Sequence, residues 1–123
     1  MQLGKFSVSL AVKDIQASRV FYEKIGFQVI TGKQEDGWLM MGNGSATIGL
    51  FRGMFDKNIL TFNPGWDNEG KPVETFTDAR QLQQQFEQQN IDFVTKLGEG
   101  SQGPVSFTIV DPDGNHILID QQV

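Results

Sequence analysis

The chain has 123 residues, 38% of them hydrophobic, no cysteine and a net charge of −5 at pH 7. This length suffices for one domain with a core, and the missing cysteines exclude disulfides, thiolate nucleophiles and cysteine-based metal sites. Lys and Arg are scattered singly, so neither nucleic acid nor an anionic membrane surface is an expected partner. No run resembles a signal peptide or reaches the roughly 20 apolar residues of a membrane span, which favours the cytoplasm.

The first elements are a strand, a helix and a second strand. Residues 6–12 alternate between apolar and small or polar side chains, as a half-buried strand does. Asp14 is a helix N-cap, and Gly26 ends the helix at a left-handed position. Between them, one helical face is predicted to carry the side chains Ile15, Ser18, Val20, Phe21 and Tyr22. Residues 27–30 return as a strand.

The same pattern recurs 64 residues later. Asp14 corresponds to Asp78, a second N-cap, and Gly26 corresponds to Asn90, which also tolerates a left-handed helix end. The apolar positions of the helix and of the following strand match without a gap. This internal repeat indicates a duplicated supersecondary unit.

Each unit continues as a hairpin. Residues 38–41 and 46–51 flank Asn43-Gly44, the residues preferred in a type I′ turn. In the second half, residues 105–110 and 116–120 flank an Asp-Pro-Asp-Gly-Asn turn at 111–115. The sequence therefore predicts an α+β fold of two βαβββ modules in tandem. Module one covers about 4–51, a connection 52–70, and module two about 71–123.

These residues resemble the vicinal-oxygen-chelate superfamily, which includes glyoxalase I, extradiol dioxygenases and bleomycin-resistance proteins. The resemblance covers nearly the whole chain and is most specific at residues 12–27 and in the turn at 111–115. It implies one domain, 1–123, whose modules form a cup-shaped mixed sheet with the helices on its outer face. It does not imply one function, because this fold hosts several chemistries.

In the enzymes of that superfamily, four strand positions hold a divalent metal with His and Glu side chains. The corresponding residues here are Ser7, Gly49, Lys71 and Leu118. None supplies an imidazole or a carboxylate, the ligands that such a site requires. The sequence thus predicts no metal, no cofactor and no catalytic residue of the superfamily's type, so a role other than catalysis is favoured.

Strand parity predicts which side chains line the cup. Pairing across Asn43-Gly44 places Trp38 opposite Gly49, and Met40 opposite Thr47. Trp38 either plugs the vacated cup or forms a flat apolar wall for a ligand, with Gly49 leaving room for it. In module two, the inward residues are predicted to be Val73, Thr75, Phe107, Ile109 and Leu118. The apolar connection is expected to lie over a cup mouth or a subunit interface. The predicted ligand-binding residues are Ser7, Ser9, Trp38, Met40, Gly49, Phe62, Asn63, Trp66, Lys71, Phe107 and Leu118.

The leading hypothesis is a metal-independent protein that sequesters or senses an apolar or aromatic small molecule, acting as a homodimer. A second hypothesis is a lyase, isomerase or dioxygenase-like enzyme with other metal ligands, such as Glu74, Asp120 and His116. A third is a structural or regulatory dimer whose cup is filled by its own side chains. Glu74 aligns with a core position, where an unpaired carboxylate is costly.

Overall fold

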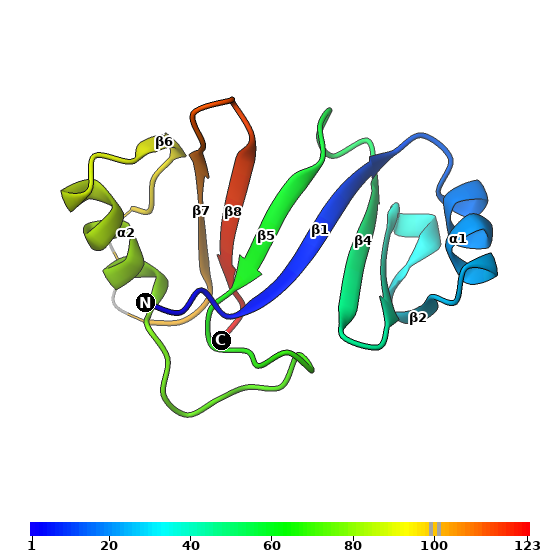
Figure 1. Ribbon diagram of the computed structural model, residues 1–123, viewed down its shortest axis with the longest axis horizontal. Coiled ribbons are helices and arrows are strands. Elements are labelled where there is room, and N and C mark those ends of the chain that lie inside the picture. The colour runs from blue at the N-terminus through cyan, green and yellow to red at the C-terminus, as the bar shows by residue number, and fades with distance from the viewer. Residues whose placement is uncertain (99, 101) are drawn as a thin grey trace. The chain divides into compact units, whose positions relative to one another are not determined.

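The computed structural model describes residues 1–98, 100 and 102–123. The chain divides into two compact units, 7–59 and 1–6 together with 60–123. Each unit packs one α-helix against one mixed β-sheet, which confirms the α+β class (Figure 1). No helix in the described ranges is both long enough and apolar enough to span a membrane.

The first unit has the βαβββ order. Its elements are β1 (Lys5–Val12), α1 (Ile15–Lys24), β2 (Gln28–Lys33), the short 3₁₀ helix η1 (Gln34–Asp36), β3 (Trp38–Asn43) and β4 (Ala46–Arg52). The strands lie in the order β2-β3-β4-β1; β1 and β4 are parallel and the other pairs antiparallel. This order arises because α1 connects β1 to β2, whereas short connections join β2 to β3 and β3 to β4 as antiparallel neighbours.

Helix α1 begins and ends as its sequence predicts. The Asp14 carboxylate accepts the N–H of Ala17 at 3.1 Å and so satisfies a free donor of the first turn. Gly26 follows the helix with φ +106°, a conformation that favours glycine. Both signals used to place the helix are therefore confirmed.

The buried face of α1 is narrower than predicted. Ile15 is buried, and Tyr22 packs at the edge of the core that Leu39, Met41 and Leu50 form in the sheet. Phe21 is 56% exposed, however, and Val20 is exposed as well. These two residues lie outside the stripe formed by positions 15 and 22, so assigning them to the buried face was wrong.

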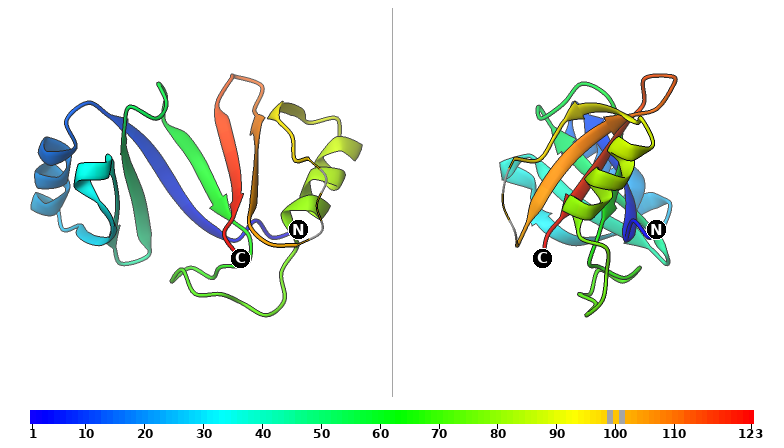
Figure 2. Two further views of the ribbon diagram at one scale, coloured as in Figure 1. Left: turned by 180° about the vertical axis from the view of Figure 1, so that it is seen from behind. Right: turned by 90° about the vertical axis from the view of Figure 1, so that its left-hand side faces the viewer.

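The second unit repeats this connectivity. Its elements are β5 (Ile59–Asn63), α2 (Ala79–Gln88), β6 (Asp92–Thr95), β7 (Val105–Val110) and β8 (His116–Gln121). The strands lie in the order β6-β7-β8-β5; β5 and β8 are parallel and the other pairs antiparallel. Figure 2 shows β7 and β8 side by side, with α2 packed beside them. The predicted turn between them is confirmed, since the N–H of Asp111 donates to the carbonyl of Asn115.

The helical part of the 64-residue repeat is confirmed by α2. Asp78 accepts the N–H of Arg80 at 2.9 Å, and Asn90 follows the helix with φ +60°. Leu82 and Phe86 are buried against the sheet, where the ring of Phe86 contacts that of Phe107. Caps, helices and helix ends therefore recur at the predicted spacing.

The first strand of the second unit was predicted in the wrong place. Strand β5 lies within the segment 52–70 that was expected to be a connection, whereas residues 71–77 form no strand beyond an isolated bridge between Trp66 and Pro72. The Asp67 carboxylate instead accepts the N–H groups of Glu69 and Lys71, which folds this segment into a turn. A long loop thus separates β5 from α2 (Figure 1).

The first six residues pack with the second unit. The rings of Phe6 and Phe62 lie 5.1 Å apart, and Leu3 packs against the core of that unit. The Lys5 ammonium group donates to the carbonyl of Asn68 at 2.8 Å. A side chain at Gly4 would collide with the backbone of Asn63, so the two segments approach each other closely.

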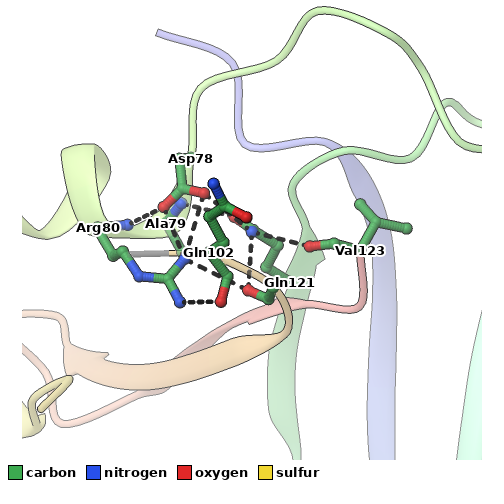
Figure 3. Close-up of polar contacts among 7 residues, drawn as sticks. Asp78, Ala79, Arg80, Gln102, Gln121 and Val123 are labelled. Atoms are coloured by element: carbon green, nitrogen blue, oxygen red, sulfur yellow. Dashed lines mark hydrogen bonds and ion pairs between the residues drawn. The ribbon is translucent and has the colours of Figure 1, made fainter. Parts of the chain in front are cut away.

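A buried glutamine joins the start of α2 to the end of β8 (Figure 3). Gln121 is 1% exposed; its carbonyl accepts the N–H of Ala79 at 2.7 Å. Its amide nitrogen lies within hydrogen-bond distance of Asp78 Oδ2 and of the carbonyls of Gly103 and Val123. Partial burial would raise the pKa of Asp78, but the N–H of Arg80, the Gln121 amide and the Arg80 guanidinium together hold that pKa below its usual value.

Candidate functional site

The sheet of the first unit has one face that points away from the core beneath α1. Leu10, Leu39 and Leu50 belong to the α1 side, so alternation assigns their neighbours in sequence to the other side. That face carries Ser7, Ser9, Ala11, Trp38, Met40, Thr47, Gly49 and Phe51. Ser7 and Ser9 are 2% and 6% exposed, and Trp38 and Met40 are half-buried. We refer to these eight residues as the Trp38 face.

The pairing across this face differs from the prediction by two residues. Trp38 lies opposite Phe51, and Met40 lies opposite Gly49. The hairpin turns at Gly44-Ser45 rather than at Asn43-Gly44, and Gly44 has φ +59° while Ser45 does not have a positive φ. Glycine at the first central position is typical of a type II′ turn. A shift by two preserves parity, so the side chains assigned to the face are unchanged.

Gly49 is covered by the protein's own side chains. A Cβ atom at this position would collide with the ring of Phe51 and would lie 3.0 Å from the sulfur of Met40. Phe51 is in turn supported by Phe55, with ring centroids 5.5 Å apart. The expectation that Gly49 leaves room opposite Trp38 was therefore wrong; Phe51 and Met40 occupy that space.

This packing predicts that Gly49→Ala destabilises the protein by about 1–3 kcal/mol, because the added methyl overpacks the contact with Phe51. Shortening the neighbour in Gly49→Ala/Phe51→Leu should recover part of the loss. Urea denaturation of both variants measures the effect. Gly98→Ala, where the new methyl meets nothing within 4 Å, is the matched control. Equal losses for the two single variants would contradict this account.

The sheet of the second unit also has a face that points away from its helix. Thr61 pairs with Leu118, and Leu118 pairs with Thr108, so these residues share that face. Phe107 and Ile109 lie on the opposite face, buried against α2, and Phe62 packs against the same core. The strand register on β7 and β5 turns these three side chains toward the helix. It was therefore wrong to predict that Phe107 and Ile109 point into the cup, and that Phe62 lines a pocket.

Asp120 lies on the same face as Leu118, two residues further along β8. Its backbone carbonyl accepts the side-chain amide of Asn63 at 2.8 Å, which explains the burial of that asparagine as a structural contact. Burial raises the pKa of the Asp120 carboxyl above its usual value, although a hydrogen bond from Gln122 partly opposes the shift.

The raised pKa means that ionised Asp120 is less stable in the folded chain than in the unfolded one. Ionisation of Asp120 therefore reduces stability above its folded pKa, and this penalty disappears below its unfolded pKa. We expect Asp120→Asn to raise the urea midpoint at pH 7 and to have a smaller effect at pH 3. Asp113→Asn, at an exposed turn position, serves as the control. An Asp120→Asn variant that is destabilised equally at both pH values would contradict the expectation.

Residues 6–119 match the family model of the glyoxalase/bleomycin resistance protein/dioxygenase superfamily. The chain belongs to this superfamily. No curated protein matches it. The match spans both units and agrees with the repeated βαβββ connectivity described above.

Solved structures support the fold of the superfamily. A superfamily member from Vibrio splendidus 12B01 has a TM-score of 0.67 at 16% identity, covering 97% of this chain and 98% of the other. A protein from Legionella pneumophila, described as an NAD-dependent benzaldehyde dehydrogenase, has a TM-score of 0.69 at 19% identity, covering 96% and 99%. At these identities the likeness establishes the fold alone.

The superfamily's metal positions can be assigned again from the observed register. Ser9 pairs with Gly49, and Thr61 pairs with Leu118, so Thr61 corresponds to Ser9. Ile59 therefore corresponds to Ser7, and Lys71 was the wrong choice. Serine, glycine, isoleucine and leucine at the four positions offer neither imidazole nor carboxylate. These residues do not fit a divalent metal site of the superfamily's type.

The other candidate ligands do not converge. Glu74 is exposed in the loop before α2, so its predicted core position was wrong. His116 and Asp120 lie four residues apart on β8, which corresponds to about 13 Å. Among the described residues, no group of three or more His, Cys, Asp or Glu side chains could hold a metal ion.

The remaining predicted site residues lie in the loop between β5 and α2. Trp66 is half-buried and forms the bridge with Pro72. The side chain of Lys71 is 74% exposed and pairs with Glu69 at 3.3 Å. Val73 and Thr75, which were expected to point inward from a strand, belong to the same loop. Lys71, Val73 and Thr75 were predicted on a strand and lie in none, so those positions were wrong, whereas Trp66 lies outside the strands as predicted.

A polar cavity of about 390 Å³ lies on the α1 side of the first unit, where the sequence predicted no site. Side chains from the start of α1, from η1 and from the end of β4 line it: Asp14, Ile15, Gln16, Arg19, Gln34, Glu35 and Arg52. These residues are drawn from three separate segments, and no motif connects them. Only the folded chain brings them together.

Proposed function

We propose that this superfamily member binds a planar apolar or aromatic small molecule on the Trp38 face without a metal ion. The observation that carries the proposal is the composition of that face. In this chain, Ser7 and Gly49 occupy two positions that hold metal ligands in the superfamily's enzymes. Trp38, Met40 and Phe51 add aromatic and thioether surface to the same face. Such surfaces favour apolar ligands.

The half-burial of Trp38 supports this role. A half-buried indole retains accessible surface for a ligand, whereas a fully buried one would not. Met40 is flexible and polarizable, so it can adjust to the shape of a bound ring. Ser7 and Ser9 lie on the same face of β1 but are 2% and 6% exposed, so Trp38 and Met40 supply the accessible surface.

A fluorescence titration with a panel of uncharged aromatic compounds tests the proposal. Trp38→Leu should weaken binding about tenfold or more, which corresponds to about 1.4 kcal/mol. Trp66→Leu removes the other indole and provides the matched control. Because both variants alter the fluorescence signal, their binding affinities are measured by calorimetry. Loss of binding in Trp66→Leu but not in Trp38→Leu would place the ligand elsewhere and overturn the proposal.

Elemental analysis tests the metal-independent part separately. Protein purified without chelators should contain no stoichiometric Ni, Zn, Fe or Mn, because the superfamily's ligand positions lack suitable side chains. Ligand binding should also be unchanged by EDTA. Stoichiometric metal whose removal abolishes binding would contradict this part.

A second candidate is a structural or regulatory role with a self-filled sheet face. Phe51 and Met40 cover Gly49, which favours this role over a deep pocket at that position.

We also expect a homodimer in the cytoplasm; the exposed side chains of Phe21, Ile25 and Ile30 in the first unit support self-association. Light scattering measures the oligomeric state. If no compound of the aromatic panel binds in the titration, the structural or regulatory role is favoured.

A further inference from the structure

The polar cavity of the first unit has the size of a small-molecule site. Its volume of about 390 Å³ lies within the range of about 300–1,000 Å³ typical of ligand pockets. None of its lining residues belongs to the Trp38 face, so the cavity and that face are separate features. Its lining side chains include two guanidinium groups, two carboxylates and two primary amides.

Two of the four charged lining side chains, Asp14 and Arg19, already have partners among the described residues. The Asp14 carboxylate accepts the N–H of Ala17. Arg19 pairs with Glu23 at 3.5 Å and donates to Gln34 Oε1 at 3.2 Å. In the part of the chain that the structure describes, the Arg52 side chain has no hydrogen-bond or ion-pair partner. Within those residues, the cavity therefore offers one unpaired cation.

The polar groups around Arg52 are held in place by the chain itself. Gln34 accepts from Arg19 and donates to Gln16, which links α1 to η1. The backbone N–H of Arg52 donates to the carbonyl of Gly37 at 2.8 Å, at the end of the same 3₁₀ turn. The Arg19 guanidinium thus contacts the start of this turn, whereas Arg52 contacts its end through the backbone and keeps an exposed side chain. Groups fixed before binding lose less entropy when a ligand arrives.

We propose that this cavity binds a small hydroxylated monocarboxylate, with Arg52 as the cation that receives its carboxylate. A guanidinium group matches the two oxygens of a carboxylate with parallel hydrogen bonds. The amides of Gln16 and Gln34 both donate and accept, and so suit a neighbouring hydroxyl group. A phosphate dianion fits less well, because Glu35 also lines the cavity and repels the second charge.

An NMR titration with sodium glycolate, at ionic strength held constant with sodium chloride, tests the proposal. The backbone amide signals of Gln16, Gln34 and Arg52 should shift together and saturate with a Kd of about 1–10 mM. Arg52→Gln should raise that Kd at least about tenfold. Lys57→Gln removes the same charge from an exposed position outside the cavity and should leave the Kd unchanged.

Two further results separate a carboxylate site from general charge attraction. Glu35→Gln should lower the Kd for glycolate about two- to threefold, because it removes a like charge. Inorganic phosphate should bind more weakly than glycolate to the unaltered protein. No saturable shift, equal effects of Arg52→Gln and Lys57→Gln, or tighter binding of phosphate would each overturn the proposal. Trp38→Leu should not alter glycolate binding, which keeps the test independent of the Trp38 face.

Discussion

Gln121→Leu is expected to destabilise the protein by about 2–4 kcal/mol. The substitution keeps a side chain of similar size but removes every hydrogen bond that the buried amide makes. The N–H of Ala79 then loses its acceptor, and the carbonyl of Gly103 loses a donor. A buried polar group without a partner costs about 1–3 kcal/mol. The midpoint of urea denaturation at an unchanged m-value measures the loss.

Gln84→Leu provides the matched control for this prediction. Gln84 is exposed on α2, so the same change of side chain should alter stability by no more than about 0.5 kcal/mol. A difference smaller than about 0.5 kcal/mol between the two variants would show that the hydrogen bonds of Gln121 contribute little.

Phe107→Ala is expected to cost about 3–5 kcal/mol, the usual range for a buried phenylalanine. Its ring is fully buried and contacts the rings of Phe86 and Phe93, at centroid distances of 5.9 and 5.7 Å. Phe107→Leu should cost less and still fold, because most of the volume remains. Thermal and urea denaturation measure both variants.

The Phe107 variants also separate a core residue from a ligand contact. If Phe107 acts only in the core, Phe107→Leu should lose stability but keep the affinity for any compound that binds the Trp38 face. Phe21→Ala, at an exposed position on α1, is the control and should be nearly neutral. A Phe107→Leu variant with normal stability and lost binding would restore the pocket role that the sequence suggested.

The fold could be predicted from the sequence because its strongest signals are local. The caps Asp14 and Asp78 and the helix ends Gly26 and Asn90 each act within one turn of their own helix. The misplaced strand β5 required long-range information. Its five residues follow a segment rich in Gly, Asp and Asn, and the 64-residue repeat applies to the helices but not to this strand. A gapless alignment had no place for the loop between β5 and α2.

The candidate site was predictable only where residue type decided the question. The lack of metal ligands at Ser7, Gly49 and Leu118 follows from their chemistry and needs no geometry. The direction of Phe107 depends on strand register, and the covering of Gly49 by Phe51 depends on where the hairpin turns. The polar cavity draws on three segments without a motif, so nothing in the sequence indicated it.

The packing of residues 1–6 with the second unit has a consequence for synthesis on the ribosome. Residues 7–59 form a compact unit that is continuous in the chain, so the whole unit emerges before residue 60. The segment that carries Leu3 and Phe6 emerges before that unit, yet its partner Phe62 and strands β7 and β8 emerge after it. Chains are made vectorially, and domains generally fold as units. Residues 1–6 are therefore expected to remain exposed to chaperones and proteases until β8 has been translated.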